Sequence, residues 1–210
     1  MSDTAPLLIV LSGPSGAGKG TALQLLEELG FVRIATYTTR PPRKGEIDGV
    51  HYNFVTYNTF QTMRATGQFI EYTRTYRDYW YGAPTALCDD LAPTPYVVEL
   101  EVQGFHRVRA QSMRRVVGIF LVVDNPETLS RRIVSRHPEQ NLEARTNVVA
   151  SQLSHAWAYD YVVENGTLAE FQDRIRCVAR AEVLRREGKL WMAQNWAKMD
   201  ETLRESEAKQ

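Results

Sequence analysis

The sequence predicts an α/β protein in which helices cover both faces of a central parallel β-sheet. Short apolar runs without polar alternation are typical of parallel strands buried on both sides. They recur along this chain between segments of helical periodicity. At 210 residues the chain is long enough for one domain with a sizeable core. It contains no internal repeats or low-complexity stretches, so the alternation of strands and helices decides the fold class.

The first unit is a strand, a glycine-rich turn and a helix. Residues 7–11 form an apolar run of mostly branched side chains, which predicts the strand. A helix face with the spacing i, i+3, i+4, i+7 follows at Ala22, Leu25, Leu26 and Leu29. Gly30 is well placed to end this helix, because glycine tolerates the left-handed conformation that often follows the last turn.

The turn between this strand and helix, Gly13-x-x-x-x-Gly18-Lys19, has the spacing of a phosphate-binding P-loop. Successive backbone N–H groups must turn inward around a phosphate, and a Cβ would obstruct both the turn and the anion. The helix N-terminus adds unpaired N–H donors, and the Lys19 ammonium can reach the β- and γ-phosphates. The predicted phosphate site comprises Gly13, Pro14, Ser15, Gly16, Ala17, Gly18, Lys19, Gly20 and Thr21.

The loop departs from the strict motif at one position. In that motif a Ser or Thr directly after the lysine holds Mg²⁺. Here Gly20 takes this place and Thr21 follows it. Either the Thr21 hydroxyl serves the ion, or the ion is held through water.

Overall charge and composition limit the classes of function. Lys plus Arg and Asp plus Glu both number 25, so the chain lacks the basic excess of a nucleic-acid binder. No apolar run is long enough to span a membrane and the first residues form no export signal, which predicts a cytoplasmic protein. Metal-ligand spacing does not occur among Cys88, Cys177, His51, His106, His137 and His155.

The segment after the first helix predicts two strands joined by a cationic loop. The strands are residues 32–36 and 49–55. Between them, two prolines exclude a helix and leave Arg40 and Arg43 in a loop. Arginine binds phosphate bidentately, so this pair in a chain with a P-loop indicates a second phosphorylated ligand.

An aromatic cluster follows in the middle of the chain, at Tyr76, Tyr79, Trp80 and Tyr81. Aromatic side chains mostly pack in cores, but so many phenols in one stretch also suit a pocket that stacks on a base and bonds a phosphate. Residues 97–102 then predict a strand that carries two carboxylates on one face, because strand side chains alternate. These carboxylates are Glu99 and Glu101.

The next part of the chain predicts a strand and two arginine-bearing helices. The strand is residues 117–122. The first helix begins and ends at prolines, residues 126–138, and places Arg132 and Arg136 four residues apart on one face. Arg145 lies early in the second helix.

The last part predicts one more strand and a terminal helix. The strand is residues 160–163, and residues 167–170 have the form of a capping box. The helix that this box opens is expected to end at about Glu187. In the charged tail after it, Trp191 and Trp196 are expected to dock a further helix onto the domain.

Together these motifs resemble the guanylate kinase family, whose members move the γ-phosphoryl group of ATP onto GMP. The resemblance runs from Leu7 to about Glu187. The matching residues are Leu11-Ser12-Gly13-Pro14-Ser15-Gly16-Ala17-Gly18-Lys19-Gly20-Thr21, Thr38-Thr39-Arg40-Pro41-Pro42-Arg43-x-Gly45-Glu46, Tyr52-x-Phe54-Val55, Phe69-Ile70-Glu71, Trp80-Tyr81-Gly82, Glu99-x-Glu101-Val102-Gln103-Gly104 and Tyr159-Asp160-Tyr161-Val162-Val163-Glu164-Asn165.

The resemblance implies a P-loop nucleotide kinase with an inserted GMP-binding lobe and a lid. The kinase-like domain would span 5–188, with core segments 5–36, 97–125 and 159–188, a lobe at about 37–96, a lid at about 126–158 and a charged helical tail at 189–210. The implied ligands are ATP with Mg²⁺, and GMP or dGMP as acceptor. Such an enzyme would serve purine nucleotide metabolism in the cytoplasm as a monomer or homodimer.

Carried over by position, the resemblance also implies site residues. The transferring phosphoryl would be surrounded by Lys19, Arg132, Arg136 and Arg145, and Asn165 would join the ATP site. The GMP phosphate would be held by Arg40, Arg43, Tyr52 and Tyr81. The guanine would lie at Thr36, Glu71, Ala83 and Glu101. A carboxylate such as that of Glu71 accepts from guanine N1–H and the 2-amino group, whereas adenine presents an acceptor at N1.

The sequence departs from the family pattern at three further places. Ala83 stands where these enzymes usually have a Ser or Thr that bonds the guanine. The stretch 71–81 is one residue longer than in the family. The lid segment 136–145 is about two residues shorter, and His137 replaces a glycine.

Two rival functions stay open. A kinase of the same fold could use another nucleotide or a ribose bisphosphate as acceptor, but the full set of acceptor residues from Arg40 to Glu101 favours GMP. A related binding module could recruit partners without catalysis, but the P-loop with Lys19 favours an enzyme. A switch GTPase is disfavoured because no Asn-Lys-x-Asp motif occurs.

Overall fold

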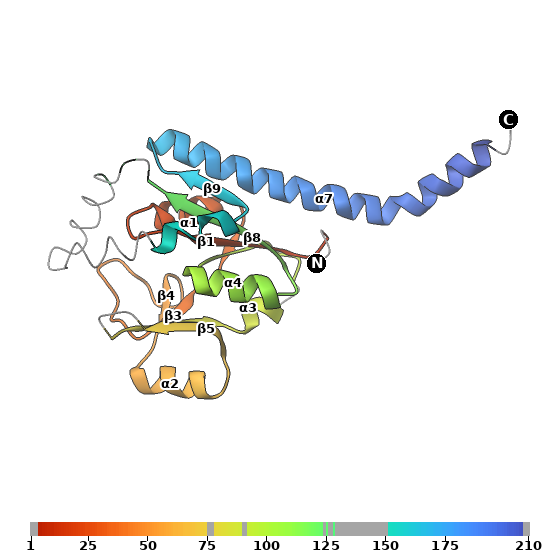
Figure 1. Ribbon diagram of the computed structural model, residues 1–210. Helices are drawn as coiled ribbons and strands as arrows, with labels where there is room; N and C mark the ends of the chain where they lie inside the picture. Colours follow the sequence, from red (N-terminus) through yellow and green to blue (C-terminus); the bar gives the residue numbers. More distant parts are fainter. Residues whose placement is uncertain are drawn as a thin grey trace.

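Five parallel strands form the central sheet of the protein (Figure 1). The computed structural model describes residues 4–74, 78–89, 92–123, 125, 128 and 151–207. The strand order is β2 (Val32–Arg33), β7 (Tyr96–Glu99), β1 (Leu7–Ser12), β8 (Arg115–Val122) and β9 (Tyr161–Glu164). Every residue of β1 is buried, as expected for an apolar strand with neighbours on both sides. The predicted α/β fold with a parallel sheet is confirmed.

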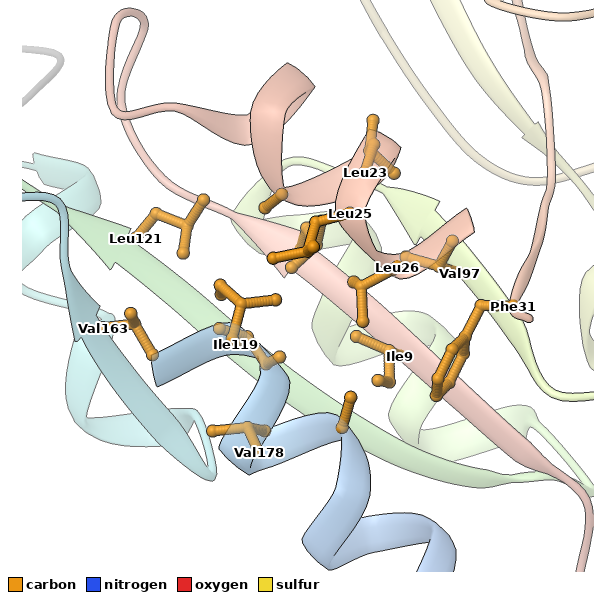
Figure 2. Close-up of a cluster of buried hydrophobic side chains, with 14 of the residues drawn as sticks. Ile9, Leu23, Leu25, Leu26, Phe31, Val97, Ile119, Leu121, Val163 and Val178 are labelled. Atoms are coloured by element: carbon orange, nitrogen blue, oxygen red, sulfur yellow. The ribbon is translucent and has the colours of Figure 1, made fainter. Parts of the chain in front are cut away.

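Helices cover both faces of this sheet. On one face, α1 (Lys19–Glu28) and α7 (Leu168–Glu207) pack on a cluster that includes Ile9, Ile119 and Val163 (Figure 2). On the other face, α3 (Ala86–Asp89) and α4 (Val102–Gln111) pack with Leu8 and Val10. Because side chains alternate along β1, neighbouring residues of this one strand contribute to both clusters. A short 3₁₀ helix, η1 (Ala156–Ala158), precedes β9.

A second, smaller sheet with its own helix forms what we call the lobe. Its strand order is β4 (Tyr52–Phe54), β3 (Thr36–Thr38), β6 (Trp80–Pro84) and β5 (Phe69–Arg74). The helix α2 (Tyr57–Ala65) buries Phe60 against Phe69 of β5, with ring centroids 4.5 Å apart. Thr56 caps α2, since its hydroxyl accepts the N–H of Thr59 at 3.1 Å.

Two strand predictions are wrong in detail. The predicted strand 32–36 is two strands, because the chain leaves the central sheet after β2, crosses at Ile34 and Ala35, and enters the lobe as β3. The predicted strand 97–102 ends at Glu99, because the pairing with β1 stops where the P-loop begins. Glu101 is instead the N-cap residue of α4, so the two carboxylates do not share a strand face.

The helix α7 begins as predicted and continues past its predicted end. The Thr167 hydroxyl accepts the N–H of Glu170 at 3.3 Å and the Glu170 carboxylate accepts the N–H of Thr167 at 3.3 Å, which confirms the capping box. A single glycine costs a helix about 1 kcal/mol, so Gly188 does not stop it. Trp191 is 52% exposed, so its predicted docking is wrong; the side chain of Trp196 lies outside the described part.

Several predictions fall on residues that the structure does not describe. These are Tyr76, the helix at 126–138 with Arg132 and Arg136, and Arg145 in the helix after it. The division of the chain into core, lobe and lid therefore stays a prediction. Within the described ranges, no helix is both long enough and apolar enough to cross a membrane.

Candidate active site

The glycine-rich loop lies at the carboxyl end of β1, in the middle of the central sheet (Figure 1). Two of its glycines are required by backbone geometry. Gly13 has φ 140°, and a Cβ there would lie 2.4 Å from the carbonyl oxygen of Leu121 in β8. Gly18 has φ 100°, and a Cβ there would lie 2.3 Å from Nδ2 of Asn165. The loop is thus held tightly against β8 and the end of β9.

Lys19 is the first residue of α1, and its side chain lies back over the loop. The Lys19 Nζ donates to the carbonyl oxygens of Gly13 at 2.6 Å and Pro14 at 3.2 Å. It also lies 3.7 Å from a carboxylate oxygen of Glu99 at the end of β7. The first turn of α1 contains no acidic residue, so nothing on this turn cancels the positive end of the helix dipole. The loop therefore has the geometry and charge to bind an anion.

Asn165 supports the loop from below. Its Nδ2 donates to the carbonyl oxygen of Ala17 at 2.9 Å, and its backbone N–H donates to Val122 at 2.8 Å. The side chain is buried and occupies the space left by the missing Cβ of Gly18. In this structure the predicted nucleotide residue Asn165 contacts the loop through Ala17, one residue before Gly18.

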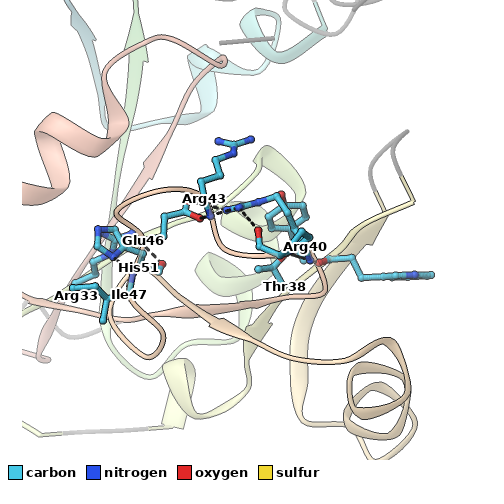
Figure 3. Close-up of polar contacts among 10 residues, drawn as sticks. Arg33, Thr38, Arg40, Arg43, Glu46, Ile47 and His51 are labelled. Atoms are coloured by element: carbon cyan, nitrogen blue, oxygen red, sulfur yellow. Dashed lines mark hydrogen bonds and ion pairs between the residues drawn. The ribbon is translucent and has the colours of Figure 1, made fainter. Parts of the chain in front are cut away.

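A second cationic cluster lies in the lobe around Arg40 (Figure 3). The Arg40 side chain is buried, and its Nε donates to the hydroxyl oxygen of Tyr81 at 3.2 Å. Its guanidinium carbon lies 5.4 Å from the ring centroid of Tyr52, and the rings of Tyr52 and Tyr81 are 5.9 Å apart. The structure thus brings together three of the four residues predicted for the acceptor phosphate.

Glu46 is the partner of Arg40 that the predicted site did not include. Its two carboxylate oxygens accept from Nη1 and Nη2 of Arg40 at 2.8 and 2.9 Å, and it also accepts the backbone N–H of Arg43 at 2.6 Å. Burial opposes ionisation of this carboxyl, but these hydrogen bonds prevail and hold the pKa of Glu46 below its ordinary value. The Arg43 side chain is exposed and extends away from the carboxylate (Figure 3).

Glu99 lies between the P-loop and the lobe cluster. Besides its ion pair with Lys19, its negative charge is the main cause that raises the pKa of Tyr52, with burial adding to the effect. The Tyr52 phenol therefore stays protonated and can donate to an anion. The sequence did offer a signal for Glu99, namely a carboxylate at the end of a strand that is otherwise apolar.

Glu71 is a carboxyl group buried in the lobe near α4. It lies on β5, opposite Ala83 on β6, and is 5% exposed. Burial raises its pKa to about 7, the Arg107 charge opposes this shift, and the Glu101 charge adds to it. Such a group is an acceptor when ionised and a donor when protonated. Burial removes most of the water around the Glu71 carboxyl. A ligand that supplies two N–H donors would replace the hydrogen bonds that water gives to an exposed carboxylate.

The other residues predicted for the guanine lie on three different elements of the structure. Thr36 is buried on β3, and Ala83 is 1% exposed within the apolar cluster that also contains Leu87. Glu101 is exposed and accepts from Gln152 at 2.7 Å. Thr85, the nearest hydroxyl after Ala83, donates to the carbonyl oxygen of Gly67 at 3.0 Å and is therefore engaged by the turn after α2.

The fold and the loop place the chain among α/β nucleotide kinases of the P-loop type. A parallel sheet with a glycine-rich loop after its central strand, and a separate lobe with its own cationic cluster, defines this class. The arginines that resemblance assigns to the transferring phosphoryl, Arg132, Arg136 and Arg145, lie outside the described residues.

Comparison with known proteins gives the family. The guanylate kinase family model matches residues 6–182. A guanylate kinase of Desulfitobacterium hafniense is 38% identical over 88% of this chain and 94% of its own length, and one of Sphingopyxis alaskensis is 36% identical over 86% and 84%. The crystal structure of guanylate kinase from Anaplasma phagocytophilum superimposes with a TM-score of 0.68 at 31% identity, covering 85% of this chain and 87% of that one. The chain belongs to the guanylate kinase family.

Proposed function

We propose that this protein transfers the γ-phosphoryl group of ATP to GMP, and also to dGMP, giving ADP and the nucleoside diphosphate. The observation that carries the choice of acceptor is the buried carboxyl of Glu71 in a lobe that also holds Arg40 and Tyr81. An ionised Glu71 accepts from N1–H and the 2-amino group of guanine, whereas adenine would present a lone pair to it. A cytoplasmic location is part of this proposal, because ATP and GMP are metabolites of that compartment. The proposal also includes a monomer or homodimer as the oligomeric state.

The donor nucleotide is proposed to bind at the P-loop. The backbone N–H groups of the loop and the start of α1 would surround its phosphates, with Lys19 turning from the carbonyl oxygens of Gly13 and Pro14 to the β- and γ-oxygens. Asn165 would join this site and keep the loop in shape through its bond to Ala17. The exposed loop residues Ser15, Gly20 and Thr21 leave the entrance to this cradle open to solvent.

Magnesium fits the chemistry that the loop presents. Mg²⁺ prefers oxygen ligands and keeps several waters, so it needs few protein ligands when phosphates hold it. The exposed hydroxyl of Thr21 would hold the ion, directly or through water. No cluster of three His, Cys, Asp or Glu side chains that could form an all-protein metal site occurs in the ranges that the structure describes. When bound, the ion neutralises charge on the β- and γ-phosphates.

The acceptor phosphate is proposed to bind between Arg43, Tyr52 and Tyr81, with Arg40 behind them. An oxygen of this phosphate forms the new bond to the γ-phosphorus while the bond to the β–γ bridging oxygen breaks and ADP leaves. The residues need only align the two phosphates and balance their charge, so no general base is required. Arg132, Arg136 and Arg145 are proposed to complete this charge balance.

A coupled assay for ADP release tests the proposal. ATP is supplied with GMP, dGMP, AMP, IMP or ribose bisphosphate as acceptor, and we expect turnover with GMP and dGMP to exceed the others. The Lys19→Met variant should fold normally and turn over roughly 10²- to 10³-fold more slowly, because a preorganised charge contact contributes about 3–4 kcal/mol. Preference for another acceptor, or near-normal turnover by Lys19→Met, would contradict the proposal.

A further inference from the structure

We propose that Glu46 is a positioning residue that holds the acceptor-phosphate site in its binding geometry before GMP arrives. The inference rests on the proposed function. Glu46 lies in the loop between β3 and β4 and accepts hydrogen bonds from two arginines, one buried and one exposed. It binds the guanidinium of buried Arg40 and the backbone N–H of exposed Arg43 (Figure 3).

The donors of Arg40 are almost all used within the protein. Its Nε donates to Tyr81, Nη1 to the carbonyl oxygen of Pro41 and to Glu46, and Nη2 to Glu46. A guanidinium has five N–H donors, so these four bonds leave one. Arg40 therefore cannot grip a phosphate bidentately while Glu46 is in place. Its main task is to orient its neighbours.

The neighbour that gains most from this arrangement is Tyr81. Its phenol oxygen accepts from Arg40, so its own O–H is left to donate toward a ligand. The ring of Tyr52 lies against the same guanidinium and 5.9 Å from the ring of Tyr81. Glu46 thus holds Arg40 in place. Arg40 in turn orients the hydroxyl of Tyr81 and packs against the ring face of Tyr52.

The second task of Glu46 concerns Arg43. The Oε2 atom that binds Nη1 of Arg40 also accepts the backbone N–H of Arg43 at 2.6 Å. This bond closes the turn from Arg43 to Glu46, whose N–H in turn donates to the Arg43 carbonyl oxygen at 3.0 Å. The point from which the Arg43 side chain extends is therefore set by the same carboxylate.

Removal of the Glu46 carboxylate should change the affinity for GMP in opposite directions, depending on whether Glu46 positions the site or acts only through its charge. A carboxylate near a phosphate dianion repels it, so on charge alone Glu46→Ala and Glu46→Gln would both bind GMP more tightly. If Glu46 positions the site, both variants bind GMP more weakly. Glu46→Gln should lie between wild type and Glu46→Ala, because its amide oxygen can keep the bonds from Arg43 and from Nη1 of Arg40.

The experiment measures KM and kcat for GMP together with GMP affinity by calorimetric titration, for wild type, Glu46→Gln and Glu46→Ala. We expect the GMP KM and dissociation constant of Glu46→Ala to rise roughly 10- to 100-fold, as for loss of hydrogen bonds to charged groups. The kcat and the KM for ATP should stay within about twofold, because a contact that acts equally in ground and transition state changes KM alone. Asp48→Ala is the matched control, since Asp48 caps the same loop through the N–H of Phe54 and does not bind either arginine.

The outcomes separate this inference from the proposed function. Wild type that neither binds nor phosphorylates GMP would overturn both. Wild type that uses GMP, with Glu46 variants that bind GMP as well as or better than wild type, would overturn the positioning role alone. An equal loss in Asp48→Ala would likewise overturn it, because the effect would then come from general damage to the loop. If Glu46→Ala does not fold, the comparison of Glu46→Gln with wild type decides: weaker GMP binding by Glu46→Gln supports the positioning role, and equal or tighter binding overturns it.

Discussion

The P-loop and the lobe are both proposed to bind a phosphate, but they use different parts of the chain. In the P-loop the shape comes from the backbone, and atoms of Leu121 and Asn165 fill the space where side chains of Gly13 and Gly18 would be. In the lobe the shape comes from side chains, with Glu46 holding Arg40 and Arg40 holding Tyr81. The first region should therefore be sensitive to added atoms, and the second to removed ones.

Among the substitutions that test this comparison, the largest effect is expected for Gly18→Ala in the P-loop. A non-glycine residue at φ 100° costs about 1–3 kcal/mol, and displacement of Asn165 would lose a hydrogen bond of about 0.5–1.5 kcal/mol. We expect turnover at fixed ATP to fall on the order of 10²-fold, measured in the coupled assay. Gly20→Ala is the control in the same loop, because an added Cβ there would meet nothing within 4 Å and the φ of Gly20 is not positive. Equal losses in both variants would contradict a steric cause.

Removing one charge from the lobe should have the next largest effect. Glu71→Gln replaces an ionised acceptor by an amide that can accept only one of the two guanine N–H groups. Hydrogen bonds to charged groups contribute about 1.5–3 kcal/mol, so the GMP KM should rise roughly 10- to 100-fold. The same variant should discriminate less well against AMP. Unchanged preference for GMP would mean that the base does not bind at Glu71.

The same substitution should change how stability depends on pH. The pKa of Glu71 is raised by burial from 4.5 to about 7, so the folded protein binds this proton more tightly than the unfolded chain. The protonated Glu71 carboxyl contributes its full share to the free energy of unfolding below about pH 4.5, and this share is lost as the pH rises to about 7. Glu71→Gln has no carboxyl to ionise here and does not suffer this loss. Its free energy of unfolding should therefore rise by about 1–3 kcal/mol relative to wild type between about pH 5 and pH 8. Thermal unfolding of both proteins across this range measures it; a constant difference would contradict the raised pKa.

The smallest effect is expected where an atom is added to the lobe. Ala83 lies directly opposite Glu71 across two strands, so a hydroxyl at this position can reach that carboxylate or the base. Ala83→Ser should lower the GMP KM roughly two- to tenfold, the worth of one neutral hydrogen bond. Thr85→Ala is the control and should leave KM unchanged, because its hydroxyl bonds Gly67. If instead Thr85→Ala raised KM, Thr85 would be the residue that serves the base.

The sequence predicted best where a local pattern leaves one solution. The apolar runs of β1 and β8 have no polar side to expose, and the glycine spacing of the P-loop follows from the backbone turn itself. Gly30, with φ 91°, follows α1 as expected. These features need no information from distant parts of the chain.

The features that escaped prediction depend on distant partners. The chain passes from the central sheet to the lobe at Ile34 and Ala35, and no proline or glycine marks this point. Only the pairing of β2 with β7 and of β3 with β6 decides where it happens. The helix α4 has a glycine and few apolar residues, so its sequence hides a helix that is stabilised by packing of Phe105. The role of Glu46 depends on a buried arginine, and burial of Arg40 is a property of the folded lobe.

The position of the lobe within the chain has a consequence for how the protein folds. In the central sheet, Val32 of β2 pairs with Tyr96 of β7, and the whole lobe lies in the chain between them. The entropy lost on closing a loop grows with the logarithm of its flexible length. A lobe that folds first brings its two ends together and leaves only short connections to be closed. A lobe that folds first would therefore ease the pairing of β2 with β7, and a variant that slows its folding would delay a sheet to which it contributes no strand.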